Sequence, residues 1–413
     1  MEASGGAASL DGSAVEALRA AGVRGEVIGP EDDRYEAART VYNAMVDKHP
    51  ALIARCVDAA DVITAVDFGR EHGLDVAVRC GGHSRAGWGL VDGGLTIDLS
   101  PIRWVRVDPD ARTAQVGGGS QQGDLDHAAH AFGLATPTGI MSTTGIGGLT
   151  LGGGHGHLTR RYGLTLDNVL GADVVLADGS FVRASESENE DLFWALRGGG
   201  GNFGVVTAFT FRLHPVHTVV MGITLWPIEQ IPEVLRWYRE FLPKAPEDLN
   251  GFFALLPVPP APPFPEEIHL KKMCGVMWCY LGDPEEQDDV FAPVRRAGTP
   301  AFHFATPMPY PALQSMLDAL IPAGLQWYQR GDFFDEITDE AIEVHLEYAR
   351  NNPTTLSTMQ LYPIDGAVHR VSEDATAWSY RDALWSGVID GTDPDPAKAG
   401  VIRQWCVGYW KAL

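Results

Sequence analysis

The glycines of this chain gather in clusters that could bind phosphate groups. Glycine lets a backbone approach a ligand closely, and successive N–H groups in such a loop can point into one concavity that holds phosphate without a cation. Several of these clusters in the first half of the chain predict a long ligand with many contact points, and a dinucleotide fits that description. The clusters lie at Gly81-Gly82, Gly117 to Gly119, Gly145 to Gly156 and Gly198 to Gly204.

The segment from Gly199 to Gly204 matches the G-x-G-x-x-G pattern of nicotinamide-binding proteins. That pattern binds a pyrophosphate only where a strand precedes it and a helix follows it. Here a helix is expected over 191–197 and a strand over 205–213, so the order is reversed. The sequence therefore argues against a nicotinamide site.

His83 is the single residue that the sequence most strongly indicates for a chemical role. It follows a predicted strand over 75–79 and lies between Gly82 and Ser84, on a loop without apolar periodicity. An imidazole there can act as a nucleophile or a base. A loop histidine that only satisfies a hydrogen bond is the alternative interpretation.

Two histidine pairs, His155 with His157 and His127 with His130, could suggest a metal site. Metal sites need three or four converging ligands, and no further ligand stands near either pair in the sequence. The second pair also lacks an HExxH pattern. No metal site is predicted.

The composition disfavours several classes of function. The chain has 413 residues, with 31 Lys and Arg against 54 Asp and Glu, and its net charge of −23 disfavours binding to nucleic acid or anionic lipid. The sequence contains no run of about 18 apolar residues, so no membrane span is predicted. Its first residues lack the basic start and apolar block of a signal peptide, so a cytoplasmic location is expected. The five cysteines form no CxxC pair and are expected to be buried free thiols.

Local patterns predict the helices and strands that position these candidates. Asp58 and Gly73 mark the two ends of a helix, and Asp178-Gly179 is typical of a hairpin turn. Elements of the first half are expected at 58–72 (helix), 75–79 and 95–99 (strands), 104–107 with 113–116 (hairpin), 121–132 (helix), 171–183 (hairpin), 188–197 (helix) and 205–213 (strand). Those of the second half are expected at 219–226 (strand), 229–241 (helix), 269–281 (strand), 310–320 and 338–349 (helices), and 355–362 and 367–371 (strands). Because strands and helices do not alternate strictly, the predicted fold class is α+β.

The composition changes near His214-Pro215. The chain before this point is rich in glycine, and the chain after it holds most of the 27 prolines. We therefore expect a lead-in over 1–45, a first domain over 46–216 and a second domain over 217–413. A proline-rich loop over 257–265 is expected to be an exposed linker.

Four separated motifs resemble the flavin-binding domain of berberine-bridge-enzyme-like oxidases, which belong to the p-cresol methylhydroxylase (PCMH) / vanillyl-alcohol oxidase superfamily. The motifs are Arg79-Cys-Gly-Gly-His-Ser84, the glycine-rich segment from Gly139 to Gly163, Leu166-Asp-Asn168, and Gly198-Gly-Gly-Gly-Asn-Phe-Gly-Val-Val206. The resemblance is strong over residues 40–215. It continues more weakly to about residue 390, through Leu361-Tyr-Pro-Ile-Asp-Gly-Ala-Val and Glu373-Asp-Ala-Thr-Ala-Trp-Ser-Tyr-Arg-Asp.

The resemblance implies a two-domain flavoprotein. The first domain would be a PCMH-type FAD-binding domain, and the second an antiparallel-sheet substrate domain covered by helices. The loop 79–84 would hold the FAD pyrophosphate, and His83 would carry a covalent bond to the flavin. Some members add a second bond from a cysteine, but Met141 fills that position here, so single attachment is expected. The residues expected to bind FAD are Arg79, Cys80, Gly81, Gly82, His83, Ser84, Gly139, Ser142, Thr143, Thr144, Gly145, Gly148, Gly152, Gly153, Gly154, His157, Val205 and Val206.

The resemblance also implies a base near the flavin, which family members take from a tyrosine or a carboxylate. The favoured candidates are Tyr328, Tyr362 and Tyr380, and Gln360 and His369 are further candidates. Each of them could instead be a core residue. Family members usually continue past a helix like that of 397–413 with a segment that returns to the flavin domain. Either the sequence is truncated at Leu413 or the protein has lost this segment. If the segment is truly absent, a flavin-binding protein without turnover is the alternative of another class.

These observations predict an FAD-dependent oxidase. It would transfer a hydride from an alcohol or amine carbon of a small molecule to covalent FAD, with reoxidation by O2 to hydrogen peroxide. The enzymatic alternatives are an FAD dehydrogenase or a natural-product tailoring enzyme with another electron acceptor. The expected partners are a small-molecule substrate and O2, without nucleic acid or membrane, and the chain is expected to be a monomer or homodimer.

Overall fold

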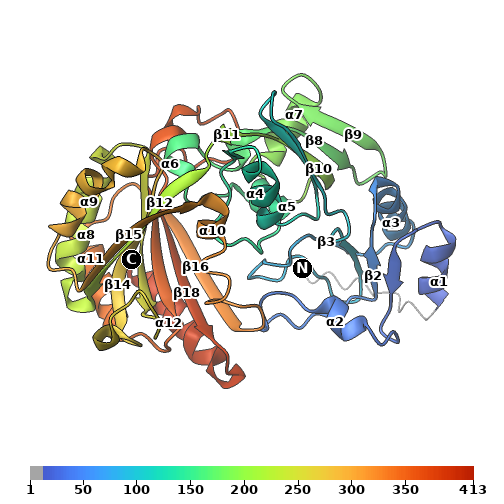
Figure 1. Ribbon diagram of the computed structural model, residues 1–413. Coiled ribbons are helices and arrows are strands. Elements are labelled where there is room, and N and C mark those ends of the chain that lie inside the picture. The colour runs from blue at the N-terminus through green and yellow to red at the C-terminus, as the bar shows by residue number, and fades with distance from the viewer. Residues whose placement is uncertain (1–12) are drawn as a thin grey trace.

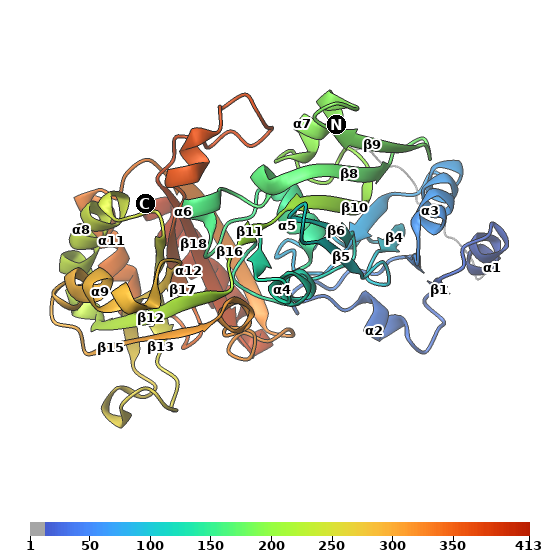
Figure 2. The same cartoon turned by 45° about the horizontal axis from the view of Figure 1, so that its top comes forward.

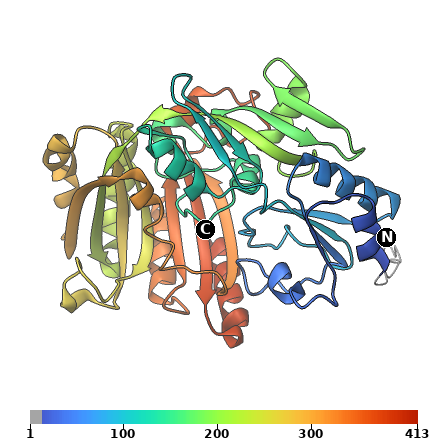
Figure 3. The same cartoon turned by 45° about the vertical axis from the view of Figure 1, so that its right-hand side comes forward.

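The computed structural model describes residues 13–413, which form two parts with separate sheets (Figure 1, Figure 2 and Figure 3). The first part holds a four-stranded sheet in the order β1 (Glu26–Ile28), β2 (Leu52–Arg55), β4 (Leu95–Asp98) and β3 (Val76–Arg79). It also holds a five-stranded sheet in the order β5 (Val105–Asp108), β6 (Thr113–Gly117), β10 (Val205–Arg212), β8 (Val169–Val175) and β9 (Phe181–Ser185). Strands β2, β4 and β3 are parallel, whereas the five-stranded sheet is antiparallel.

Short helices surround the two sheets of the first part. They are α1 (Ser13–Ala20), α2 (Tyr35–Arg39), α3 (Ala59–Glu71), α4 (Gln122–His130), α5 (Ile146–Gly152), α6 (Thr159–Tyr162) and α7 (Glu190–Leu196). The short strand β7 (Leu134–Ala135) pairs with β11 (His214–Pro215), and from there the chain enters the second part.

The second part is built on one seven-stranded antiparallel sheet. Its order is β15 (Phe302–Pro309), β12 (Thr218–Pro227), β14 (Lys272–Tyr280), β13 (Leu249–Pro257), β17 (Thr358–Pro363), β18 (Trp385–Asp393) and β16 (Gln326–Phe334). Helices α8 (Ile231–Phe241), α9 (Gln287–Arg295) and α11 (Asp339–Arg350) lie at the end of the molecule remote from the first part (Figure 1). Helix α12 (Ala399–Ala412) packs on β16 and β18, and α10 (Tyr310–Gln314) packs on α4 of the first part.

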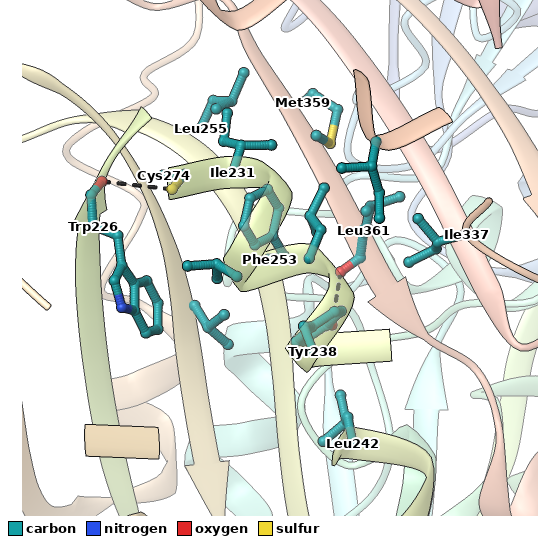
Figure 4. Close-up of a cluster of buried hydrophobic side chains, with 14 of the residues drawn as sticks. Trp226, Ile231, Tyr238, Leu242, Phe253, Leu255, Cys274, Ile337, Met359 and Leu361 are labelled. Atoms are coloured by element: carbon teal, nitrogen blue, oxygen red, sulfur yellow. Dashed lines mark hydrogen bonds between the residues drawn. The ribbon is translucent and has the colours of Figure 1, made fainter. Parts of the chain in front are cut away.

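The core of the second part lies between this sheet and its helices (Figure 4). Tyr238 of α8 packs there with Phe253 and Leu361, and its hydroxyl donates to the carbonyl oxygen of Gly251 at 2.7 Å. Since side chains alternate along a strand, the residues next to Leu361 in β17 must point to the opposite face. Gln360 and Tyr362 therefore face away from the helices, toward the first part.

Several expected elements are confirmed where local signals are strong. Helix α3 begins after Asp58, whose carboxylate accepts from the backbone N–H of Asp61 at 3.0 Å, and the chain leaves it through Gly73 with φ +63°. The hairpin of β8 and β9 turns at Gly179 with φ +85°. The α+β class, with an antiparallel second sheet covered by helices, is also confirmed.

Other expectations were wrong or incomplete. The strand predicted over 367–371 is a 3-10 helix, Gly366–Arg370, because Gly366 has φ +68° and packs so closely on α6 that an added Cβ would lie 2.4 Å from the Arg160 carbonyl oxygen. The helix predicted over 310–320 ends at Gln314. Strands β13, β15, β16 and β18 were not predicted.

A buried arginine joins the two parts. Arg160 of α6 is 1% exposed, and its Nε and Nη2 donate to the two carboxylate oxygens of Asp365 at 2.7 and 3.1 Å. Its remaining N–H groups donate to the carbonyl oxygens of Ala245, Pro246 and Leu249. Beside it, the Asn250 side chain donates to two carbonyl oxygens of the first part, those of Gly156 and His157, at 2.9 Å each.

We expect Arg160→Met to destabilise the protein by about 3–5 kcal/mol, because the substitution leaves the Asp365 carboxylate buried without its cation. Arg161→Met is the matched control. Arg161 is half-exposed and pairs with Asp248 at 3.2 Å, so its loss should cost about 0–1 kcal/mol. Urea unfolding curves of the two variants measure the difference, and equal shifts of both curves would contradict this role for Arg160.

Candidate active site

Polar side chains line the face of the seven-stranded sheet that is turned toward the first part. They are Gln329 of β16, Gln360 and Tyr362 of β17, and Ser386 and Asp390 of β18, called the polar face below. Gln329 and Asp390 are cross-strand neighbours, and the Gln329 Nε2 donates to the Asp390 Oδ1 at 2.9 Å. Burial raises the pKa of Asp390, and the nearby Arg85 cation partly opposes this effect.

His83 lies on the loop after β3, between hydroxyl groups of the loop that precedes α5. Its ring stacks on Tyr42 with 4.0 Å between ring centroids. The Thr143 Oγ1 lies 3.1 Å from its Nε2, and the Thr144 Oγ1 lies 3.3 Å from its Nδ1. Burial, with a smaller contribution from the Arg85 cation, lowers the pKa of His83 to about 4. The imidazole is therefore neutral at physiological pH and keeps a nitrogen lone pair.

Arg85 connects the His83 loop to the large sheet. Its guanidinium carbon lies 3.8 Å from the ring centroid of Trp327, which is in β16, and 4.7 Å from that of Tyr42. Trp327 points to the same face of β16 as Gln329, because the two residues are separated by two positions. The contact therefore brings His83 and the polar face to the same interface.

His155 extends this interface from the end of α5. Its Nε2 lies 3.2 Å from the Ser386 Oγ, and its ring is 4.7 Å from that of Tyr362. The Tyr362 hydroxyl donates to the Gln360 Oε1 at 2.5 Å. Burial raises the pKa of Tyr362 and lowers that of His155 to about 4, so both groups are neutral at physiological pH.

The glycines near His83 fall into two groups with different roles. Gly81 and Gly145 hold two loops together, since an added Cβ on either would lie 2.3 Å from a backbone nitrogen of the other. Gly148 and Gly152 are exposed on one side of α5, and an added Cβ on either would meet nothing within 4 Å. This open glycine surface continues from the His83 loop and offers the close backbone approach that a dinucleotide needs.

Several residues expected to bind a cofactor also make contacts within the protein. The Arg79 guanidinium pairs with Asp98 at 2.6 Å. The Cys80 thiol is buried against Gly145 and Gly147, and this burial raises its pKa to about 11. Gly82, Gly153 and Gly154 have positive φ, and the Ser84 Oγ accepts from the Trp88 N–H. Gly139 packs on Gln122, Ser142 donates to Asp318, and the His157 ring is tilted against that of Phe252. Val205 and Val206 are buried in β10.

The three tyrosines expected near the reaction centre lie in different places. Tyr362 is on the polar face beside His155. Tyr328 packs on the helix-covered face of the sheet under the guanidinium of Arg403, which lies 5.5 Å from its ring. Tyr380 is 50% exposed and stacks on Phe333. The structure thus brings only Tyr362 of the three to the polar face, and the His369 Nε2 donates to the carbonyl oxygen of Ala383 at 3.0 Å.

Sequence reasoning missed Arg85, Gln329 and Asp390, although two signals were available. Arg85 stands two residues after His83 on the same loop. Gln329 and Asp390 lie on strands that were not predicted, and the alternation of these strands would have placed both residues on one face. His155 was considered only as a metal ligand.

Comparison with known proteins agrees with this arrangement. A family model described as an FAD binding domain matches residues 50–185, which include His83, Thr143 and Thr144. An FAD-linked oxidoreductase of Dictyostelium discoideum is 33% identical over 368 residues, covering 88% of this chain and 78% of that protein. The chain belongs to the FAD-linked oxidoreductases.

Solved structures of these oxidoreductases share the whole architecture. The berberine-bridge-enzyme-like protein 1 of Physcomitrella patens has a TM-score of 0.85 at 23% identity, covering 97% of this chain and 88% of its own. The glucooligosaccharide oxidase of Acremonium strictum, which carries a 6-S-cysteinyl, 8α-N1-histidyl FAD, has a TM-score of 0.81 at 26% identity, covering 96% and 87%. The likeness therefore includes the seven-stranded sheet, which lies outside the family model. In the part of the chain from residue 13 onward, no helix is long and apolar enough to cross a bilayer.

Proposed function

We propose that the protein is an oxidase that takes a hydride from an alcohol or amine carbon of a small molecule, with FAD attached through His83 and O2 as the electron acceptor. The observation that carries this proposal is His83 itself. A partly buried, neutral imidazole is held by two threonine hydroxyls opposite a polar face that can receive a substrate. The glucooligosaccharide oxidase with a histidyl FAD supports both the linkage and the reaction class.

The residues present fit FAD. The open surface at Gly148 and Gly152 would let FAD approach the protein backbone closely. Thr143 and Thr144 would offer hydroxyl groups next to the attachment point. FAD supplies the two-electron acceptor that the twenty amino acids lack, and O2 takes these electrons up to give hydrogen peroxide. We propose residues 46–216 as the FAD-binding domain and 217–413 as the substrate domain.

We propose Asp390 as the general base of the reaction. Loss of a hydride from an alcohol or amine carbon also releases a proton from the oxygen or nitrogen, and a carboxylate can accept it. Asp390 is 4% exposed, lies on the polar face, and keeps a raised pKa through burial. Tyr362, which is neutral, would orient the substrate by a hydrogen bond together with Gln360. Asp390 is a carboxylate, so it was not among the three tyrosines that the sequence favoured for this role.

The purified protein should bind one FAD per chain, and the flavin should stay with the pellet after acid precipitation. His83→Ala should release all flavin into the acid supernatant, while FAD still binds before acid treatment because the glycine surface is unchanged. Absorbance spectra of pellet and supernatant measure both effects. A yellow pellet from His83→Ala would identify Cys80 as the tether, and a chain without any FAD would contradict the proposed function.

Met141→Cys should create a second flavin bond. Met141 is 7% exposed, packs with Tyr42 and Trp327, and stands two residues before Thr143, so a thiolate there would lie near the His83 attachment point. Peptide mass analysis should find flavin on the His83 peptide alone in the unchanged protein and on a cross-linked pair of peptides in the variant. Flavin on a cysteine peptide of the unchanged protein that lacks His83 would show that the position is misassigned.

Asp390→Asn should lower kcat/KM by about 10²–10⁴-fold, the usual contribution of a general base, and should leave FAD content unchanged. In the unchanged protein kcat/KM should fall as the pH drops through the raised pKa of Asp390, because the base becomes protonated; the variant should lose that limb of the profile. Tyr328→Phe, on the helix-covered face, is the control and should keep full activity. Release of hydrogen peroxide with a substrate found by screening measures the activity of all three proteins. A larger loss of kcat/KM in Tyr328→Phe than in Asp390→Asn would reject Asp390 as the base.

A further inference from the structure

Arg85 places a permanent positive charge at the interface between His83 and the polar face. The rings of Trp327 and Tyr42 lie against its guanidinium at 3.8 and 4.7 Å. Its Nη1 is buried and has no hydrogen-bond partner. Within residues 13–413, no carboxylate forms an ion pair with it, although the cation is close enough to lower the pKa values of Asp390 and Tyr362 against the larger effect of burial.

The two fully buried arginines of the described residues, Arg160 and Arg381, have carboxylate partners. Arg381 donates to both oxygens of Asp167 at 2.9 and 2.7 Å, and Arg160 does the same with Asp365. Removing a cation from water without a partner costs several kcal/mol. Arg85 is only partly buried, but its buried Nη1 has no acceptor within residues 13–413, and an anion that binds at this interface would supply one.

Asp390 does not fill this role, although it is the nearest candidate on the polar face. Its Oδ1 already accepts from Gln329, and no ion pair with Arg85 forms. The aromatic rings lie against the guanidinium, so the N–H groups in its plane are the ones left to bind. Two parallel N–H groups of a guanidinium match the two oxygens of a carboxylate.

We propose that Arg85 binds a carboxylate of the substrate, so that the substrates are small organic acids whose alcohol or amine carbon is oxidised beside Asp390. This inference rests on the proposed function, since it takes the interface as the substrate site. It narrows the substrate class from any alcohol or amine to those that carry a negative charge. It also assigns the two charged residues separate tasks, with Arg85 holding the acid group and Asp390 receiving the proton.

The test is calorimetric titration of the FAD-loaded full-length protein with acetate and benzoate, and with the neutral acetamide and benzamide. At least one acid should bind about tenfold or more tightly than its amide. Arg85→Gln should weaken that binding about tenfold or more, as expected for a lost charge-assisted contact, and Arg85→Lys should restore part of it. Arg330→Gln is the matched control, because Arg330 also lies over an aromatic ring, that of Tyr328 at 5.0 Å, but on the opposite face of β16. It should bind the acid as the unchanged protein does.

Several results would overturn the proposal. They are equal binding of acid and amide, no binding of either acid, equal effects of Arg85→Gln and Arg330→Gln, and inorganic phosphate binding as tightly as the carboxylates. Loss of FAD from Arg85→Gln would show that the partner anion belongs to the cofactor. Failure of the proposed function gives a different result. If the protein without substitutions contains no FAD, the oxidase assignment is contradicted. Calorimetry on the same chain still reports whether Arg85 binds a carboxylate.

Discussion

The hydrogen bonds of one buried guanidinium determine how the two parts of the molecule meet. Arg160 has five N–H bonds, and each of them reaches an acceptor in the second part, two on Asp365 and three on backbone carbonyl groups. Such a set of bonds tolerates little displacement, because every shifted donor would be left buried without a partner. The backbone of Gly366 packs against the same helix turn and leaves no room for a side chain. His83 and the polar face lie on opposite sides of this interface, so their spacing depends on this contact.

A second constraint is the alternation of side chains along the large sheet. Residues of β17 such as Leu361 enter the core under the helices, and their neighbours Gln360 and Tyr362 then point toward the first part. The same alternation separates Tyr328 from Trp327 and Ile389 from Asp390. One face of the sheet is therefore apolar and buried by helices, while the other carries amide, hydroxyl and carboxylate groups to the His83 loop. The sheet supplies both the stability of the second part and the chemistry of the interface.

The sequence allowed prediction of the elements whose causes are local. The cap at Asp58, the turn at Gly179 and the glycine-rich motifs around His83 depend on nearby residues, and the structure has them where they were expected. The strands β16 and β18 could not be found in this way, because glycines and polar residues interrupt both of them and the period-2 contrast between apolar and polar residues is weak. Gly366 was misassigned because its conformation depends on Arg160, which is remote in the sequence. Asp390 was missed because only the pairing of remote strands places it near His83. Arg85 stands two residues after His83, but its contacts with Tyr42 and Trp327 become visible only in the folded chain.

The charge of Arg85 links the two groups on which the chemistry depends. Burial alone would drive both toward their neutral forms, lowering the pKa of His83 and raising that of Asp390. The cation adds to the first effect and opposes the second. It disfavours a proton on His83, whose nitrogen would have to be free for the proposed bond to the flavin, and it favours the ionised form of Asp390, which the proposed base would need in order to accept a proton. A neutral residue at this position would remove both effects together, so one guanidinium adjusts the protonation of the proposed nucleophile and of the proposed base, while burial remains the larger influence on each.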